Sequence, residues 1–188
     1  MSLVAEVRLS PEEYLRRERA AETKSEYDDG FVYAMSGASP RHNLIGAGLI
    51  RALGNHLPSR CRVYTSDMRV RILKPTRFYY PDVSVVCGEP QYAEDQRDVL
   101  VNPLIVCEVL SESTAALDRG RKFLSYQAIE SLQEYVLLSQ DEILVEHFRR
   151  DEGQWLYTVV RGADAALPLP GAECELTLRE IYYQTDLA

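Results

Sequence analysis

The sequence has no long apolar run and no excess of positive charge. Its apolar stretches stay far below the roughly 20 residues that a membrane-spanning helix needs, so we expect no membrane partner. The charged residue Glu6 comes too early in the chain for residues 1–6 to begin the apolar core of a signal peptide. The 29 acidic residues outnumber the 21 basic ones, and a net charge of −8 argues against a protein that coats nucleic acid. These absences predict a soluble, cytoplasmic protein.

Cysteine and histidine are also scarce. The four cysteines, Cys61, Cys87, Cys107 and Cys174, form no C-x-x-C pair. None of the three histidines has zinc-ligand spacing to a cysteine, which argues against a structural zinc site. Three of the cysteines lie in apolar, strand-like runs. We therefore expect free thiols that behave as small buried hydrophobes.

Positive charge is concentrated in one segment. Residues 30–81 hold eight basic residues and one acidic residue, a local charge of +7, so the rest of the chain carries −15. A local basic surface attracts phosphates even on an acidic protein. The alternative is a set of solvated strand faces that acidic loops balance in space. The candidates for nucleic-acid contact are Arg41, Arg69, Arg71, Lys74 and Arg77.

The 188 residues, of which 46% are hydrophobic, are enough for one domain with a sizeable core. The sequence predicts a mixture of helices and strands. Capping boxes mark helix starts at residues 10–13 and 177–180, and Asp29-Gly30 marks a turn. The predicted elements are helices at 10–24, 39–57 and 116–129, strands at 61–66, 68–72, 78–87, 104–110 and 134–138, hairpins at 26–35 and 143–160, a loop at 88–103, and a short terminal helix.

Two carboxylates stand in surroundings that disfavour charge. Glu108 interrupts the most apolar strand, 104–110, and a buried charge is costly unless it is paired or coordinates a metal. Asp82 follows Pro81 inside strand 78–87. Proline in a strand marks a bulge or an edge, and a bulge re-aims the neighbouring side chain. Both carboxylates are therefore candidates for an active site.

The helix after Glu108 adds a cation, because Lys122 and Tyr126 share one face. If this helix packs on the sheet, the ammonium approaches both carboxylates. Two carboxylates hold a hard cation such as Mg²⁺, and a lysine stabilises charge that develops on a phosphate. The spacing alone leaves a structural alternative open, in which Asp82 accepts turn hydrogen bonds and Glu108 forms a buried ion pair with Lys122 or Arg121.

The remaining candidates are single residues and one incomplete motif. Gly46-Ala47-Gly48 lies inside a helix and has Arg51 at the third glycine position, so the dinucleotide-binding fingerprint fails. His42 opens the second helix and Glu26 opens the first hairpin. Either residue would line a site or simply lie at the surface.

The order of these elements resembles a known nuclease pattern. Tyr80-Pro81-Asp82, followed by Cys107-Glu108-Val109, is similar to the PD-(D/E)XK motif. From about residue 13 to the C-terminus, the chain more closely resembles the Uma-type family, a bacterial group of restriction-endonuclease-like proteins. The blocks that carry this resemblance lie at 26–37, 39–43, 66–70, 80–83, 108–114, 118–126 and 132–137.

The resemblance implies an α/β fold with a restriction-endonuclease-like core, a central mixed β-sheet flanked by helices and additional β-hairpins. Residues 1–188 would form one domain, with the nuclease core at about 39–138, a helix and hairpin at 10–37, and a hairpin and helix at 143–185. The implied activity is that of a Mg²⁺-dependent endonuclease acting on DNA, with Mn²⁺ as a substitute. The alternative is a non-catalytic DNA- or protein-binding module that keeps the fold.

The resemblance also assigns site residues. Asp82 and Glu108 would be the Mg²⁺ ligands, with the Val109 carbonyl as the third. Leu110 stands where the general motif has lysine, so the lysine role passes to Lys122. The full catalytic set is Asp82, Glu108, Lys122, Glu26, His42 and Tyr126.

Aromatic residues near the hairpins offer material for assembly, which predicts a homodimer. They are Tyr33, Tyr79, Tyr80, Trp155 and Tyr157. An obligate dimer is compatible with the nuclease interpretation, because two sites can address two strands.

Overall fold

A mixed six-stranded sheet forms the centre of the computed structural model, which describes residues 8–93 and 97–187. Its strand order is β11-β10-β9-β8-β6-β3. Only β8 and β9 run parallel, and the other neighbours are antiparallel. The strands are β3 (Cys61–Thr65), β6 (Val83–Cys87), β8 (Ile105–Val109), β9 (Glu134–Leu138), β10 (Leu144–Asp151) and β11 (Gln154–Arg161).

Two smaller sheets complete the β-structure. The five-stranded sheet has the order β2-β1-β5-β4-β7, and β12 and β13 form a separate hairpin. The remaining strands are β1 (Ser25–Asp28), β2 (Phe31–Ala34), β4 (Arg69–Leu73), β5 (Thr76–Tyr79), β7 (Val99–Leu100), β12 (Ala166–Leu169) and β13 (Cys174–Thr177).

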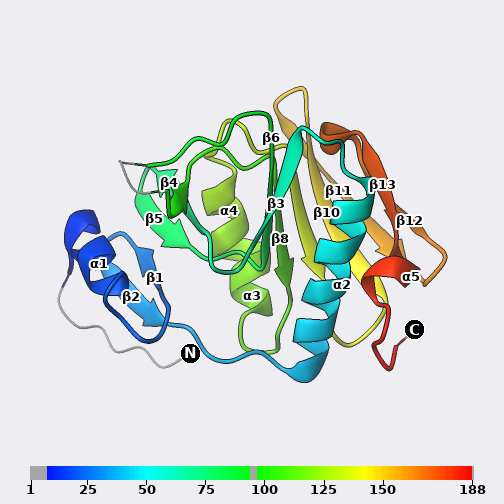
Figure 1. The fold of residues 1–188 in the computed structure, drawn as a ribbon, viewed down its shortest axis with the longest axis horizontal. Helices are drawn as coiled ribbons and strands as arrows, with labels where there is room; N and C mark the ends of the chain where they lie inside the picture. The colour runs from blue at the N-terminus through cyan, green and yellow to red at the C-terminus, as the bar shows by residue number, and fades with distance from the viewer. Residues whose placement is uncertain (1–7, 94–96, 188) are drawn as a thin grey trace.

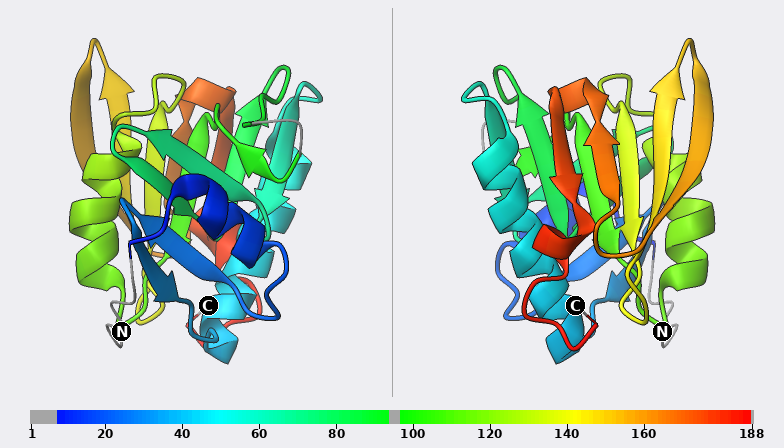
Figure 2. Two further views of the ribbon diagram at one scale, coloured as in Figure 1. Left: turned by 90° about the vertical axis from the view of Figure 1, so that its left-hand side faces the viewer. Right: turned by 90° about the vertical axis from the view of Figure 1, so that its right-hand side faces the viewer.

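Helices flank the six-stranded sheet. Helix α2 and the segment α3–α4 lie at opposite sides of the molecule, and α1 crosses the five-stranded sheet (Figures 1 and 2). The helical elements are α1 (Pro11–Glu18), α2 (Pro40–His56), α3 (Ala115–Leu117), the π-helical segment η1 (Asp118–Lys122), α4 (Phe123–Tyr126), the 3₁₀ turn η2 (Pro170–Ala172) and α5 (Leu178–Ile181). None of the helices within the described residues has the length and apolar character needed to cross a membrane.

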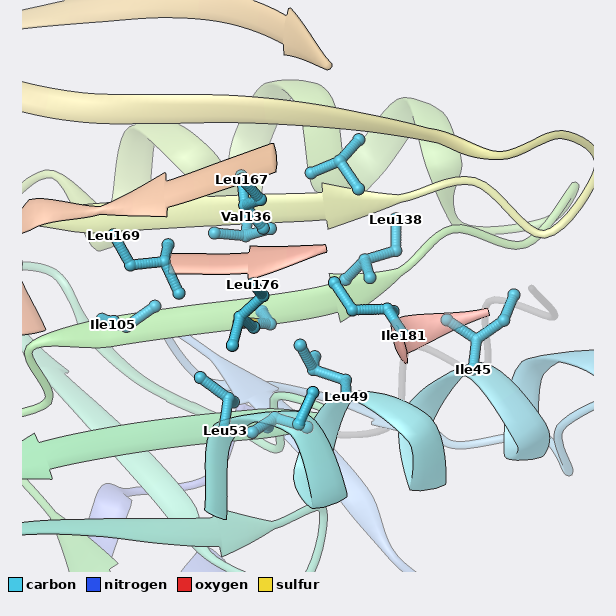
Figure 3. Packing of buried hydrophobic residues seen from close by; sticks show 14 of the residues in the cluster. Ile45, Leu49, Leu53, Ile105, Val136, Leu138, Leu167, Leu169, Leu176 and Ile181 are labelled. Carbon is cyan, nitrogen blue, oxygen red and sulfur yellow. The ribbon is translucent and has the colours of Figure 1, made fainter. Parts of the chain in front are cut away.

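The two faces of the six-stranded sheet belong to different cores. On β8, Ile105, Cys107 and Val109 point into a core with α2, α5 and the β12–β13 hairpin (Figure 3). Val106 lies in a second core with aromatic residues of α4 and β9 and with β4 of the smaller sheet. Because side chains alternate along a strand, Glu108 points to the second core, the side that carries η1 and α4.

The expected fold class is confirmed, but four predicted elements differ. Helix α1 ends at Glu18, because the Glu18 carboxylate accepts hydrogen bonds from the backbone and hydroxyl of Ser25 and the chain turns back. Strand 78–87 is divided at Pro81 into β5 and β6, which belong to different sheets. The predicted loop contains the buried strand β7. The helix after β8 contains a π-helical segment and ends at Tyr126. The hairpin β12–β13 was not predicted.

The expectation of four free thiols is wrong. Cys61 and Cys87 form a disulfide, because β3 pairs with β6 in a register that sets the two residues opposite each other. Cys107 is a buried free thiol, as expected, and Cys174 is half-buried. The wide separation of Cys61 and Cys87 in the chain hid a pairing that only the sheet topology reveals.

Candidate active site

Asp82 and Glu108 are brought together by the register of the central sheet. Val83 of β6 pairs with Cys107 of β8, so Asp82, one residue before β6, comes opposite Glu108. The Asp82 N–H donates to Glu108 Oε2 at 3.3 Å, and the Val109 N–H donates to Asp82 Oδ2 at 2.7 Å. The side chain of Asp82 is 22% exposed, whereas that of Glu108 is only 5% exposed. Asp82 therefore lies at the mouth of the site and Glu108 at its floor.

Lys122 reaches the same place from η1. Its Nζ lies 3.2 Å from Glu108 Oε1, 3.0 Å from Glu26 Oε1 and 3.5 Å from Asp118 Oδ1. The side chain is 8% exposed, and the ammonium lies 5.5 Å from the centre of the Tyr79 ring. Lys122 thus lies among three carboxylates that come from three different elements.

Glu26 and Tyr126 complete the floor of the site. Strand β1 carries Glu26, whose Oε1 also accepts a hydrogen bond from the Tyr80 N–H at 3.2 Å. Tyr126, one turn after Lys122, donates its hydroxyl to Glu108 Oε1 at 3.3 Å. Tyr126 is fully buried, and it packs edge-on against Tyr79. Both residues restrict the positions that Lys122 and Glu108 can take.

His42 approaches Asp82 from the first turn of α2. The Ser39 hydroxyl caps this helix by accepting the His42 N–H, and His42 Nε2 lies 3.3 Å from Asp82 Oδ2. Burial lowers the pKa of His42, but the hydrogen bond and charge of Asp82 and a hydrogen bond to the Val109 backbone outweigh it. The net pKa is raised above its ordinary value. The imidazole therefore favours its charged form beside Asp82.

Burial dominates the electrostatics of the floor. Desolvation raises the pKa of Glu108 well above its usual range, although Lys122 opposes this shift. Desolvation likewise raises the pKa of Asp118. Burial opposes the charge on Lys122, yet Glu108, Glu26 and Asp118 together raise its pKa well above the ordinary value. The ammonium is therefore charged at neutral pH, and the cluster has more carboxylates than cations.

The donor set fits Mg²⁺. Within residues 8–93 and 97–187, no group of three or more His, Cys, Asp or Glu side chains is arranged to hold a metal ion. Mg²⁺ takes one or two carboxylates and keeps water and phosphate oxygens. Asp82 and Glu108 are adjacent oxygen donors, bordered by the Val109 backbone. A divalent cation would also offset the excess of carboxylates over Lys122 and His42. Asp82, Glu108 and Val109 are the residues that would hold it.

Comparison with known proteins identifies the family. The family model Uma2, described as "Putative restriction endonuclease", matches residues 11–179. The chain belongs to the Uma2 family. This confirms the expected resemblance, and the blocks that suggested it contain the residues gathered at the site.

Relatives of this Uma2 protein match along most of its length. Uncharacterized protein sll1609 of Synechocystis sp. is 37% identical over 161 residues, which cover 85% of this chain and 91% of the relative. Uncharacterized protein slr1290 of the same organism is 38% identical over 159 residues, or 84% and 83% of the two chains. A crystal structure from Anabaena variabilis, described as a putative nuclease belonging to DUF820, has a TM-score of 0.74 at 21% identity and covers 93% of this chain and 97% of its own. That likeness confirms the fold.

The five predicted nucleic-acid contacts do not lie together at the site of this Uma2 protein. Four of them lie on or beside the β4–β5 hairpin. Arg69 is buried and paired with Asp98, and Arg77 is paired with Asp28 at 2.7 Å. Arg71 is half-buried over Phe78, Lys74 is exposed, and Arg41 on α2 pairs with Asp186 at 2.6 Å. Acidic residues outside segment 30–81 thus balance much of its charge. The DNA-binding role of the five basic residues stays a prediction.

One functional candidate was missed. Asp118 was not among the predicted site residues, yet its carboxylate lies in the buried cluster. Its spacing to Lys122, four residues along a helix, is a pattern that places two side chains on one face and would have indicated it. The structure brings all six predicted catalytic residues and Val109 to this place.

Proposed function

We propose that this Uma2 protein is a Mg²⁺-dependent endonuclease that hydrolyses phosphodiester bonds of DNA. The observation that carries the proposal is the convergence of Asp82, Glu108 and Lys122 at one partly open place between the sheet and η1. Membership of a family described as "Putative restriction endonuclease" supports the same conclusion. Mn²⁺ would substitute for Mg²⁺, because both accept carboxylate and carbonyl oxygens.

Each residue has a role that follows from its contacts. Asp82 and Glu108, with the Val109 carbonyl, would hold the cation, which when bound polarises a phosphoryl oxygen and makes water more acidic. The Lys122 ammonium, kept charged by the carboxylates around it, would stabilise the negative charge that develops on the phosphate. The Tyr126 hydroxyl orients the Glu108 carboxylate.

The two remaining residues hold the others in place. The raised pKa of His42 favours its charged form beside Asp82 at the mouth of the site, where the imidazole would fix the Asp82 carboxylate and favour an approaching phosphate. Glu26 would hold the Lys122 ammonium through their 3.0 Å ion pair. A homodimer, which we propose as the working assembly, would present two such sites to the two strands of a duplex.

Cleavage of supercoiled and linear DNA with Mg²⁺, with Mn²⁺ and with EDTA tests this function. We expect cleavage by the wild type with either metal, none with EDTA, and at least about a hundredfold loss in Asp82→Asn and Glu108→Gln. Glu130→Gln is the matched control, because Glu130 is an exposed carboxylate outside the cluster. Equal cleavage by the wild type and both site variants would contradict the proposal. DNA binding without cleavage would indicate the non-catalytic module instead.

A further inference from the structure

Asp118 is a buried carboxylate whose charge is offset by the nearby Lys122 ammonium and by a side-chain hydrogen bond with Thr114. It begins η1, and its side chain is 3% exposed. The Oδ1 atom is buried and makes no hydrogen bond within the part of the chain that the structure describes. Among the described residues, its one ion pair is with Lys122, at 3.5 Å. A buried charge of this kind is costly to the folded state, so a purely structural role would be better served by a neutral side chain.

The geometry of η1 aims Asp118 at Lys122. The two residues begin and end the π-helical segment, and wide turns of this kind frequently occur at functional sites. The Tyr135 hydroxyl donates to the Asp118 carbonyl oxygen at 3.1 Å, which fixes the start of the segment to β9. This contact fixes the backbone from which the Asp118 side chain reaches the Lys122 ammonium.

The three carboxylates around Lys122 are not equivalent. Glu108 belongs to the cation-holding pair, and its pull on the ammonium would weaken when it holds a cation. Glu26 is shared with the Tyr80 N–H. Asp118 has no other charged partner among the contacts of the described residues that involve its carboxylate. It is the carboxylate that would still hold Lys122 when Glu108 is engaged elsewhere.

We propose that Asp118 is a positioning residue that keeps the Lys122 ammonium beside the Asp82–Glu108 pair, at a cost to the stability of the fold. This inference rests on the proposed function for its catalytic consequence. The placement of the ammonium, however, can be measured without any cleavage.

The lysine content of the chain makes that measurement simple. Lys24, Lys74 and Lys122 are its only lysines, so protein labelled with ¹⁵N-lysine gives at most three Nζ signals by NMR. Loss of one signal in Lys122→Arg assigns Lys122. The other two lysines are internal references, because Lys24 pairs with Asp67 and Lys74 is exposed. Spectra would be recorded with EDTA and with Mg²⁺.

We expect Asp118→Asn to shift or broaden the Lys122 signal, most strongly with Mg²⁺, and Asp118→Glu to restore part of it. The melting temperature of Asp118→Asn should equal or exceed that of the wild type, whereas kcat for DNA cleavage should fall about 10- to 100-fold with KM unchanged. A merely structural carboxylate would give the opposite pattern, a lower melting temperature with unchanged kcat.

Glu134→Gln is the matched control. Glu134 is also a fully buried carboxylate, but it lies on the other face of the sheet and is bonded to His147 and to the Gly171 N–H. We expect this variant to lower the melting temperature without moving the Lys122 signal. An unmoved signal and wild-type kcat in Asp118→Asn would overturn the positioning role alone. Absence of cleavage by the wild type would instead overturn the proposed function and the catalytic consequence with it.

Discussion

Asp82 and Glu108 are joined reciprocally through the backbone of each other's strand. The Asp82 N–H donates to the Glu108 carboxylate, and the N–H of Val109, next to Glu108, donates to the Asp82 carboxylate. The separation of the two carboxylates is therefore set by the β6–β8 register and not by flexible side chains. Because a slip of one residue would turn every side chain to the other face, the packing of both cores maintains the site.

Lys122→Met should destabilise the protein by about 3–5 kcal/mol, because it leaves buried carboxylates without their cation. The loss should grow as the pH rises. Burial raises the pKa of Glu108 in the folded state, and removal of Lys122 raises it further. A group with a raised folded pKa favours folding at low pH, where it is protonated, and loses that contribution as the pH passes through the folded pKa.

Urea unfolding of the wild type and Lys122→Met at about pH 5 and about pH 8, in EDTA, measures this effect. Lys74→Met is the control, because Lys74 is exposed and its loss should leave stability unchanged. The same stability deficit of Lys122→Met at both pH values would contradict the electrostatic account of the floor.

Much of the site was predictable because its residues violate local rules. A glutamate in an apolar strand and a proline inside a strand both indicate function, and helical spacing placed Lys122 with Tyr126. Asp118 escaped because an acidic residue at a helix start is ordinary when read from the sequence. Its burial follows from η1 packing against β9 and β1, and the four-residue spacing to Lys122 indicates only a shared helix face and not that packing.

The Cys61–Cys87 disulfide should contribute about 3 kcal/mol, since it closes a loop in the unfolded chain. Thiol titration of the denatured, unreduced protein should find two free thiols, Cys107 and Cys174, and four after reduction. Urea unfolding should show lower stability with dithiothreitol than without it. Cys174→Ala should keep this difference, and Cys61→Ala with Cys87→Ala should abolish it. Four free thiols before reduction would show that the bond does not form.

Gly48 explains the incomplete glycine motif of α2. A Cβ at this position would lie 2.0 Å from the Ile181 carbonyl oxygen of α5, so only glycine lets the two helices approach. Gly48→Ala should destabilise the protein by about 1–3 kcal/mol. Gly46→Ala, whose Cβ meets nothing within 4 Å, should be neutral or stabilising by up to about 1 kcal/mol. Thermal unfolding of both variants checks the contrast, and equal effects would refute the close contact.

The fold differs from the sequence prediction where tertiary contacts override local patterns. The run 78–87 reads as one strand because both halves are apolar, but Pro81 cannot continue a ladder and the halves enter two sheets. Strand β7 has only two residues, and its pairing with β4 links distant segments. Two residues are too few to show a strand pattern in the sequence. Val99 and Leu100 are therefore recognisable as a strand only through their pairing with β4.

Exposure decides which of the predicted basic residues can meet DNA. Lys74 is exposed, whereas Arg77 is largely buried and holds Asp28 at 2.7 Å. Lys74→Gln should therefore weaken DNA binding severalfold, reduce the slope of log affinity against log salt by about 1, and leave stability unchanged.

Arg77→Gln should lower stability, because Asp28 loses one of its two arginine partners. Fluorescence anisotropy at several salt concentrations, together with urea unfolding, separates the two effects. Unaltered DNA affinity and salt slope in Lys74→Gln would remove the β4–β5 hairpin from the DNA interface.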